Sequence, residues 1–272
     1  MVPLDPEPGL IILYPGYNVP LTDWELTKAA LLADAWGRPL IEVELPGMSR
    51  HGGPLDAGAR LEMQRAGVGR FADLTNARIA AALEVVGASG SGPVVAAGYS
   101  TGASVAAQSL PWLAVRFGGL DGVVLIEPVG ILPRPVPVMF WHNVLDWRRR
   151  LAEIGRNEAT TWALGQYLAP ETRAGVRIAA LDSLVVAFTL SAETIPDAVL
   201  SAAVRTDLVR GELSALCPAD ALARLDTRLD AAGVPGESLT VPRLGHGVWH
   251  NIAAVAGLAN HLGTRAQRQG HG

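Results

Sequence analysis

The sequence predicts an α/β protein: a mostly parallel sheet with helices on both faces, and a helical cap insertion. Short apolar runs alternate with helical patterns along most of the 272 residues, which is typical of a parallel sheet. The alternation stops near residue 130, where aromatic residues occur without a clear strand, and it resumes near residue 205. We therefore expect a core domain formed by residues 1–130 and 205–272 and a helical cap formed by residues 131–204.

The expected strands are short apolar runs that end at turn-forming residues. Pro15-Gly16 follows the first run and Pro46-Gly47 the second, and such pairs commonly end strands. Helices are expected where apolar residues recur on one face. Strands are predicted at residues 10–14, 40–45, 94–97, 122–126, 206–210 and 238–241, and helices at residues 22–36, 70–86, 102–115, 219–232 and 251–262.

Composition and charge argue against a membrane protein and against a nucleic-acid-binding protein. No run reaches the roughly 20 apolar residues of a membrane helix, and the first residues lack an export signal, which favours a soluble cytoplasmic protein. The net charge is −4 and the strongest basic cluster is Arg148–Arg150, so nucleic acid is not expected as a partner. Cys217 is the only cysteine, which excludes an intramolecular disulfide. The oligomeric state stays open.

Lys28 is the only lysine, and this limits the chemistry further. It follows Thr27 in a helical pattern, so it cannot belong to a phosphate-binding Gly-Lys-Ser/Thr loop. A Schiff-base lysine is not expected either. The sequence therefore indicates no nucleotide or other cofactor.

Ser100 is the central residue of a Gly-x-Ser-x-Gly pattern, Gly98–Gly102. The pattern follows an apolar strand and precedes an alanine-rich helix, where a strained turn would expose the serine hydroxyl. The start of the helix also directs free N–H groups towards that hydroxyl. Ser100 could instead only cap the helix, but a cap needs neither glycine. We therefore expect Ser100 to be a nucleophile.

A serine hydroxyl needs a general base, and six histidines are available. His246 follows the last predicted strand, where a loop can return over the sheet, and is the strongest candidate. His51 and His142 are weaker ones. His250 lies four residues after His246, but no further ligand motif supports a metal pair, so no metal is expected.

Several motifs together resemble the α/β-hydrolase fold family over about residues 8–263. These motifs are Tyr14–Asn18, Leu45–Ser49, Gly98–Gly102, Leu125–Pro128, Leu208–Glu212 and Leu244–Gly247. The resemblance implies an oxyanion hole made by the backbone N–H groups of Tyr17 and Thr101. The side chains of Tyr17 and Asn18 could add a hydrogen bond to substrate, although Tyr17 could also only pack.

The expected acid departs from the usual family pattern. Family members commonly carry it three residues after a glycine that corresponds to Gly211, where this sequence has Ser214. Some relatives place the acid after the preceding strand, and Glu127 occupies that position. Glu127 is therefore the expected acid. Glu212 or Asp220, or a site without a working acid, are the alternatives.

The predicted cap supplies candidate substrate-binding residues, Phe140, Trp141 and Trp147, unless these aromatic side chains only build the core of the cap. Three carboxylates of the cap are expected to be helix caps or surface charges: Asp146, Asp182 and Asp197.

The function expected from this pattern is a serine hydrolase acting on an ester, thioester or lactone of a hydrophobic small molecule. One alternative is a non-hydrolytic lyase or cyclase of bacterial secondary metabolism. The other is a relative without catalysis that only binds a small molecule.

Overall fold

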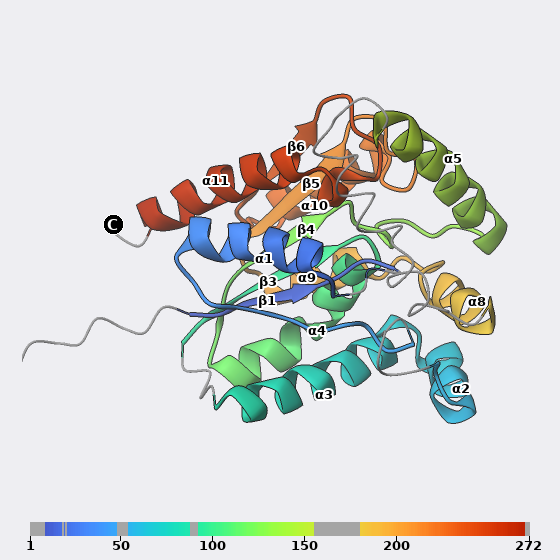
Figure 1. Ribbon diagram of the computed structural model, residues 1–272, viewed down its shortest axis with the longest axis horizontal. Helices are drawn as coiled ribbons and strands as arrows, with labels where there is room; N and C mark the ends of the chain where they lie inside the picture. Colours follow the sequence, from blue (N-terminus) through green and yellow to red (C-terminus); the bar gives the residue numbers. More distant parts are fainter. Residues whose placement is uncertain are drawn as a thin grey trace, which may run out of the picture.

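A computed structural model describes residues 9–17, 19, 21–47, 54–87, 92–154 and 180–269 (Figure 1). Of residues 147, 149–154, 180 and 264–269 it describes the backbone alone. Asn18 and His51 lie outside the described residues.

One six-stranded sheet forms the centre of the molecule, with the strand order β2-β1-β3-β4-β5-β6. Every neighbouring pair of strands is parallel, as the sequence predicts. The strands are β1 (Ile11–Tyr14), β2 (Leu40–Glu42), β3 (Val94–Tyr99), β4 (Leu120–Ile126), β5 (Thr206–Gly211) and β6 (Gly236–Val241).

The strand order reverses between β1 and β3. The chain goes from β1 outward to β2, then returns to pair β3 with the other side of β1. At such a reversal the loops after the two central strands separate, which leaves a crevice at the carboxyl ends of the strands. The segment Pro15–Tyr17 follows β1 and Ser100 follows β3, so both predicted site segments flank this crevice.

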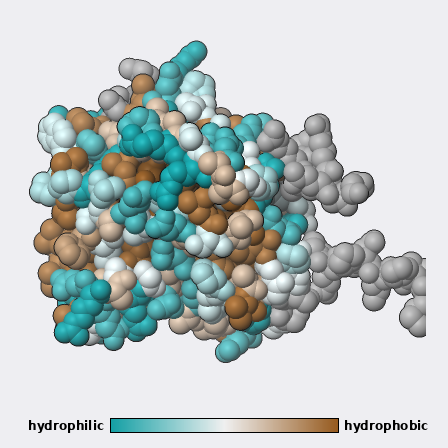
Figure 2. Space-filling model, turned by 180° about the vertical axis from the view of Figure 1, so that it is seen from behind, coloured by the Kyte–Doolittle hydropathy of each residue, from teal (hydrophilic) through white to brown (hydrophobic). Residues whose placement is uncertain are grey.

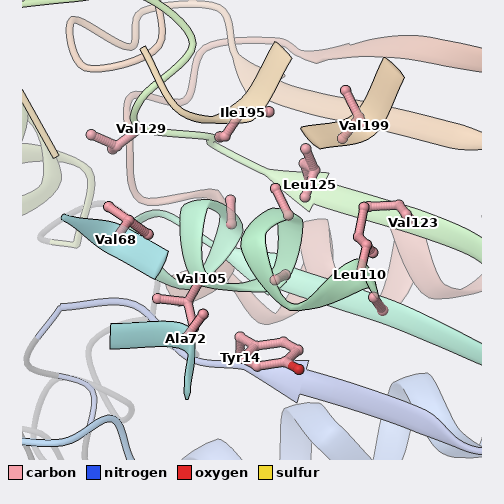
Figure 3. Packing of buried hydrophobic residues seen from close by; sticks show 14 of the residues in the cluster. Tyr14, Val68, Ala72, Val105, Leu110, Val123, Leu125, Val129, Ile195 and Val199 are labelled. Carbon is pink, nitrogen blue, oxygen red and sulfur yellow. The ribbon is translucent and has the colours of Figure 1, made fainter. Parts of the chain in front are cut away.

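Helices cover both faces of the sheet (Figure 1). On one face, α1 (Asp23–Trp36) packs beside α11 (Ile252–Gln269). The opposite face carries α3 (Val68–Val86), α4 (Thr101–Phe117), α9 (Ile195–Ala202) and α10 (Ala219–Ala231). Figure 3 shows how Val105 and Leu110 of α4 lie among side chains of α3, β4 and α9.

Two further helices lie beyond the end of the sheet that carries Ser100. These are α5 (Val136–Ile154) and α8 (Ala180–Thr189), which Figure 1 shows at the right of the molecule. Both come from the predicted insertion between β4 and β5. The helix α9 comes from the same stretch but packs on α4 in the core, with Ile195 and Val199 fully buried.

Several elements differ from the sequence-based expectation; α11, for example, continues to Gln269 instead of ending at residue 262. The strand β2 ends at Glu42 because its partner β1 ends at Tyr14, before a proline that has no N–H to continue the ladder. The helix α2 (Ala57–Ala66) was not predicted, since only Met63 of its residues is buried and its apolar pattern is weak. Asp56 caps this helix by accepting a hydrogen bond from the Ala59 N–H (2.8 Å).

Seen from behind, the surface mixes hydrophilic residues with separate hydrophobic patches (Figure 2). Several exposed large apolar side chains lie on the two outlying helices: Phe140, Trp141, Leu181, Leu184 and Phe188. Within the described ranges, no helix combines the length and the apolar composition needed to cross a bilayer.

Candidate active site

Ser100 lies in a strained turn between β3 and α4. Its φ of +56° is unusual for a residue with a side chain. Hydrogen bonds fix the turn, from the Ser100 N–H to the Ile126 carbonyl (2.9 Å) and from the Ala103 N–H to the Ser100 carbonyl (3.0 Å). The side chain makes no capping hydrogen bond to α4. The geometry therefore does not support the interpretation of Ser100 as a helix cap.

The two glycines of the motif are required by close backbone contacts. A Cβ on Gly98 would overlap the backbone of Gly102 and Ala103. A Cβ on Gly102 would overlap the carbonyl oxygens of Tyr14 and Pro15. Gly98 thus packs against the start of α4, and Gly102 against the end of β1 and Pro15, which explains why both positions must lack a side chain.

Ser100, His246 and Glu127 form one chain of hydrogen bonds. The distance from Ser100 Oγ to His246 Nε2 is 2.7 Å, and that from His246 Nδ1 to Glu127 Oε2 is 2.9 Å. His246 and Glu127 are buried, at 2% and 0% exposure. The loop after β6 therefore brings the histidine between the two residues, as a general base next to a hydroxyl requires.

Glu127 follows β4 immediately and has a φ of +53°. Its N–H donates to the Val209 carbonyl (2.7 Å). Its carboxylate accepts three hydrogen bonds: from the Gly211 N–H, from Ser214 Oγ (2.6 Å) and from the imidazole. These donors stabilise a carboxylate that has no contact with water.

The other candidate acids do not contact His246. Glu212 is exposed, and its Oε2 accepts from the Arg243 N–H (2.8 Å). Asp220 is exposed and pairs with Arg224 (3.0 Å). The usual family position holds Ser214, whose hydroxyl lies against Glu127. Among the candidates, only Glu127 contacts the histidine.

The remaining candidate histidines lie elsewhere. His142, on α5, is 3.2 Å from Arg134 Nη1, and burial together with this guanidinium lowers its pKa. His250 packs edge-on against the ring of Tyr99. Within the described ranges, no group of three or more His, Cys, Asp and Glu side chains could hold a metal ion.

A buried network supports the loop that carries His246. The Tyr99 hydroxyl donates to the His246 carbonyl (2.8 Å), and its ring stacks on Trp249. The indole N–H of Trp249 donates to Glu25 Oε2 (2.8 Å), and Lys28 pairs with Oε1 of the same carboxylate (2.6 Å). Sequence reasoning did not identify this network, because nothing local indicates that α1 meets the histidine loop.

The predicted oxyanion residues lie next to Ser100. Thr101 is the first residue of α4, so its N–H has no acceptor within the helix. Tyr17, Ser100 and Thr101 line the same cavity. The Tyr17 hydroxyl forms a hydrogen bond with Ser183 of α8, and burial raises the pKa of this phenol. Ser183 was not predicted, because an isolated serine in an apolar helix gives no sequence signal.

The cavity at Ser100 has a volume of about 80 Å³. Its apolar wall is formed by Val129, Met139, Phe140, Val186, Ala187, Leu190 and Leu216. Of the predicted substrate-binding aromatics, Phe140 contributes to this wall. Trp141 does not line it and is 57% exposed, and the side chain of Trp147 lies outside the described part of the chain.

Asp146 and Asp182 of the predicted insertion were expected to be helix caps or surface charges, and for both the expectation is wrong. Asp146 of α5 and Asp182 of α8 are each 1% exposed. Each accepts hydrogen bonds from backbone N–H groups of another segment, which compensates for the loss of hydration. Asp197 is on the surface, where it pairs with Arg228 (2.8 Å).

Known structures with the same fold include hydrolases. The monoacylglycerol lipase of Paleococcus ferrophilus has a TM-score of 0.62 at 14% identity, over 96% of this chain and 95% of that one. A thermophilic esterase from Thermogutta terrifontis gives 0.58 at 17%, over 96% and 92%. The thioesterase domain of the curacin biosynthetic pathway gives 0.57 at 16%, over 94% and 92%.

No curated protein matches the sequence. The sequence does match the alpha/beta hydrolase family over residues 11–260, and the chain belongs to this family.

Proposed function

We propose that this protein is a serine hydrolase that cleaves an ester, thioester or lactone bond of a hydrophobic small molecule. The observation that carries the proposal is the buried hydrogen-bonded chain from Ser100 through His246 to Glu127, which begins at the wall of an apolar cavity. Membership of the alpha/beta hydrolase family, and the fold shared with an esterase, a lipase and a thioesterase, support a hydrolytic reaction.

In the proposed reaction, Ser100 Oγ attacks the substrate carbonyl carbon while His246 Nε2 accepts the hydroxyl proton. Glu127 orients the imidazole and stabilises its positive charge. The N–H groups of Tyr17 and Thr101 donate to the oxyanion that forms. His246 then protonates the leaving alcohol or thiol. A water molecule, deprotonated by the same imidazole, hydrolyses the acyl-enzyme and regenerates Ser100.

The helices α5 and α8 form the cap of this proposed site. Their residues Met139, Phe140, Val186 and Leu190 make the cavity apolar, which favours an uncharged acyl group. Ser214, which stands where the family commonly has its acid, is bonded to Glu127, so the site has a carboxylate despite the unusual position. No separate observation favours a lyase or cyclase.

The test is intact-mass analysis after incubation with a fluorophosphonate. The wild type is expected to gain one adduct, and Ser100→Ala to gain none. Ser238→Ala is the matched control, because Ser238 is a surface serine bonded to Asp226 (2.7 Å), and it should react like the wild type. Glu127→Gln should react about 10⁴ times more slowly, as expected when the group that orients a catalytic histidine is neutralised.

An absent adduct in the wild type, or an adduct that persists in Ser100→Ala, would overturn the hydrolase proposal. A protein that is stabilised by small hydrophobic ligands but forms no adduct would be a binder instead.

A further inference from the structure

We infer that helix α5 positions the carboxylate of Glu127, through Asp146 and the hydroxyl of Ser214, and that this contact sets the basicity of His246. Asp146 and Ser214 are positioning residues, since neither borders the cavity at Ser100. The inference rests on the proposed function, because it assigns these residues a part in the same reaction.

Ser214 is held so that its hydroxyl proton points to Glu127. Its Oγ accepts a hydrogen bond from the Cys217 N–H (3.1 Å), which leaves the proton free to be donated to Glu127 Oε2 (2.6 Å). That oxygen also accepts from His246 Nδ1 (2.9 Å). Ser214 and the imidazole therefore share one oxygen, and the strength of one bond affects the other.

The loop that carries Ser214 is fixed by α5. Both carboxylate oxygens of Asp146 accept from the Ala215 N–H (3.1 and 3.0 Å), and Oδ2 also accepts from the Leu216 N–H (2.9 Å). Because Asp146 is 1% exposed, water does not compete for these bonds. Charge-assisted bonds in such a place are strong and specific in direction.

Arginines hold the same loop from both sides. Arg134, in the segment that leads into α5, donates to the Ala215 carbonyl (3.1 Å). Arg210 of β5 donates through Nε to the Cys217 carbonyl (3.0 Å). The core also holds the start of the loop, because the Leu213 N–H donates to the Leu244 carbonyl (2.8 Å) and the Ser214 N–H to the Gly211 carbonyl (3.1 Å). The two residues directly after Ser214 are held by the predicted cap, through Asp146 and Arg134. Movement of α5 would therefore release the Ala215–Leu216 segment and weaken the support of the Ser214 hydroxyl from that side.

The consequence for His246 follows from the charge on Glu127. A carboxylate that accepts from Ser214 attracts the imidazolium less strongly than one without this donor. Loss of the donor should therefore strengthen the attraction between Glu127 and the imidazolium, which moves the acidic limb of the pH–rate profile to higher pH. The other ionisable groups around this pair and its supporting loop include Tyr99, Arg134, His142, Asp146, Arg210, Glu212, Cys217 and His250.

The experiment measures the second-order rate constant of fluorophosphonate labelling between pH 5 and 9. Ser214→Ala and Asp146→Asn should each react about tenfold more slowly and show an acidic limb raised by roughly half a pH unit or more. The rate alone could reflect loosened packing, but the limb reports the ionisation of His246. Thermal unfolding of each variant shows whether it is folded at the assay temperature.

Two matched controls separate this role from general destabilisation. Ser238→Ala removes a serine-to-aspartate bond on the surface. Asp182→Asn alters the other buried cap carboxylate, which accepts from the Leu55 N–H (3.0 Å) and from Arg60 (2.5 Å) and does not bind the Ser214 loop. Both should keep the wild-type acidic limb, even where Asp182→Asn lowers the melting temperature.

Limbs in Ser214→Ala and Asp146→Asn that coincide with the wild type would overturn the inference and leave the hydrolase proposal intact. A shift in Asp182→Asn as large as that in Asp146→Asn would also overturn it, because loosening of the cap would then account for both. If Ser214→Ala does not fold, the comparison of Asp146→Asn with Asp182→Asn tests the inference on its own. Failure of the hydrolase proposal itself would appear earlier, as an unlabelled wild type.

Discussion

Two residues with side chains, Ser100 and Glu127, adopt a positive φ directly after neighbouring strands β3 and β4. Such a conformation costs on the order of 1–3 kcal/mol at each position and persists only where the surroundings impose it. At both positions the turn directs a polar side chain towards His246 instead of letting the chain continue as a strand. The strain is therefore located where the proposed reaction needs it.

The position of Ser214 leads to a prediction at this scale. Its Oγ lies 2.6 Å from the Glu127 oxygen that holds the imidazole, so a carboxylate placed there should be able to reach His246. Glu127→Ala is expected to lose nearly all labelling by fluorophosphonate. The double variant Glu127→Ala/Ser214→Asp should recover roughly 10-fold or more of that loss, since it restores a charge that orients the histidine.

The control for this pair is Glu127→Ala/Ser238→Asp, which adds the same charge on the surface. Equal rates in the two double variants would contradict the prediction, because the position of the new carboxylate would then be irrelevant.

At the scale of single elements, the edge strand β2 carries an unusual carboxylate. Both oxygens of Glu42 are buried, and among the described residues they have no hydrogen-bond partner. Burial, followed by the charge of Glu25, raises the pKa of Glu42 to about 8. The folded protein therefore holds a proton that the unfolded chain releases at a lower pH, near 4.5.

Because of this difference, the stability that Glu42 contributes is complete below about pH 4.5 and is lost as the pH rises through 8. Glu42→Gln stays neutral throughout this range. Its melting temperature should exceed that of the wild type by on the order of 5 °C at pH 8.5, with a clearly smaller difference at pH 5. The exposed Glu62→Gln serves as the control; a difference for Glu42→Gln that is independent of pH would contradict the prediction.

The helix α5 limits the space next to Ser100. Its Met139 is buried in the wall of a cavity of about 80 Å³, whereas binding sites for drug-sized ligands hold about 300–1,000 Å³. Met139→Ala is expected to raise kcat/KM for p-nitrophenyl octanoate relative to the butyrate ester by about 10-fold. Val138→Ala changes a neighbouring, half-exposed residue that does not line the cavity, and it should leave the ratio unchanged. A similar ratio in both variants would show that Met139 does not limit chain length.

At the scale of the whole molecule, a buried cluster joins the first helix to the histidine loop. Lys28 pairs with Glu25, and its Nζ lies 5.6 Å from the ring centroid of Trp24 and 5.1 Å from that of Trp249. Glu25 also accepts from Trp249. Both charged side chains of the pair are fully buried, so the pair depends on mutual contact rather than on water.

Lys28→Met should reduce the free energy of unfolding by about 3–5 kcal/mol, because it leaves the Glu25 carboxylate buried without its cation. Lys28→Met/Glu25→Gln removes both charges and should lose clearly less. Urea unfolding at pH 7 measures both values. A double variant that is as unstable as the single one would show that the charge on Glu25 is not the cause.

The sequence was sufficient to predict those features that depend on a local pattern of residues. The buried strands are apolar runs, and the glycines around Ser100 follow from backbone contacts that the motif itself implies. The sequence did not predict α2, because this helix is mostly exposed and has no clear apolar face. It also did not predict the hydrogen bonds of Asp146, Asp182 and Ser183, because their partners are distant in sequence. The choice among Glu127, Glu212 and Asp220 stayed open for the same reason.

The burial of Lys28 also determines how this residue reacts with amine-modifying reagents. As the only lysine of the chain, with a side chain at 0% exposure, it is shielded from acylating reagents while α1 is packed. Its ε-amino group becomes a nucleophile only when α1 separates from Trp249. The rate of acylation at Lys28 therefore measures how often the contact between α1 and Trp249 opens, without any probe introduced by mutation.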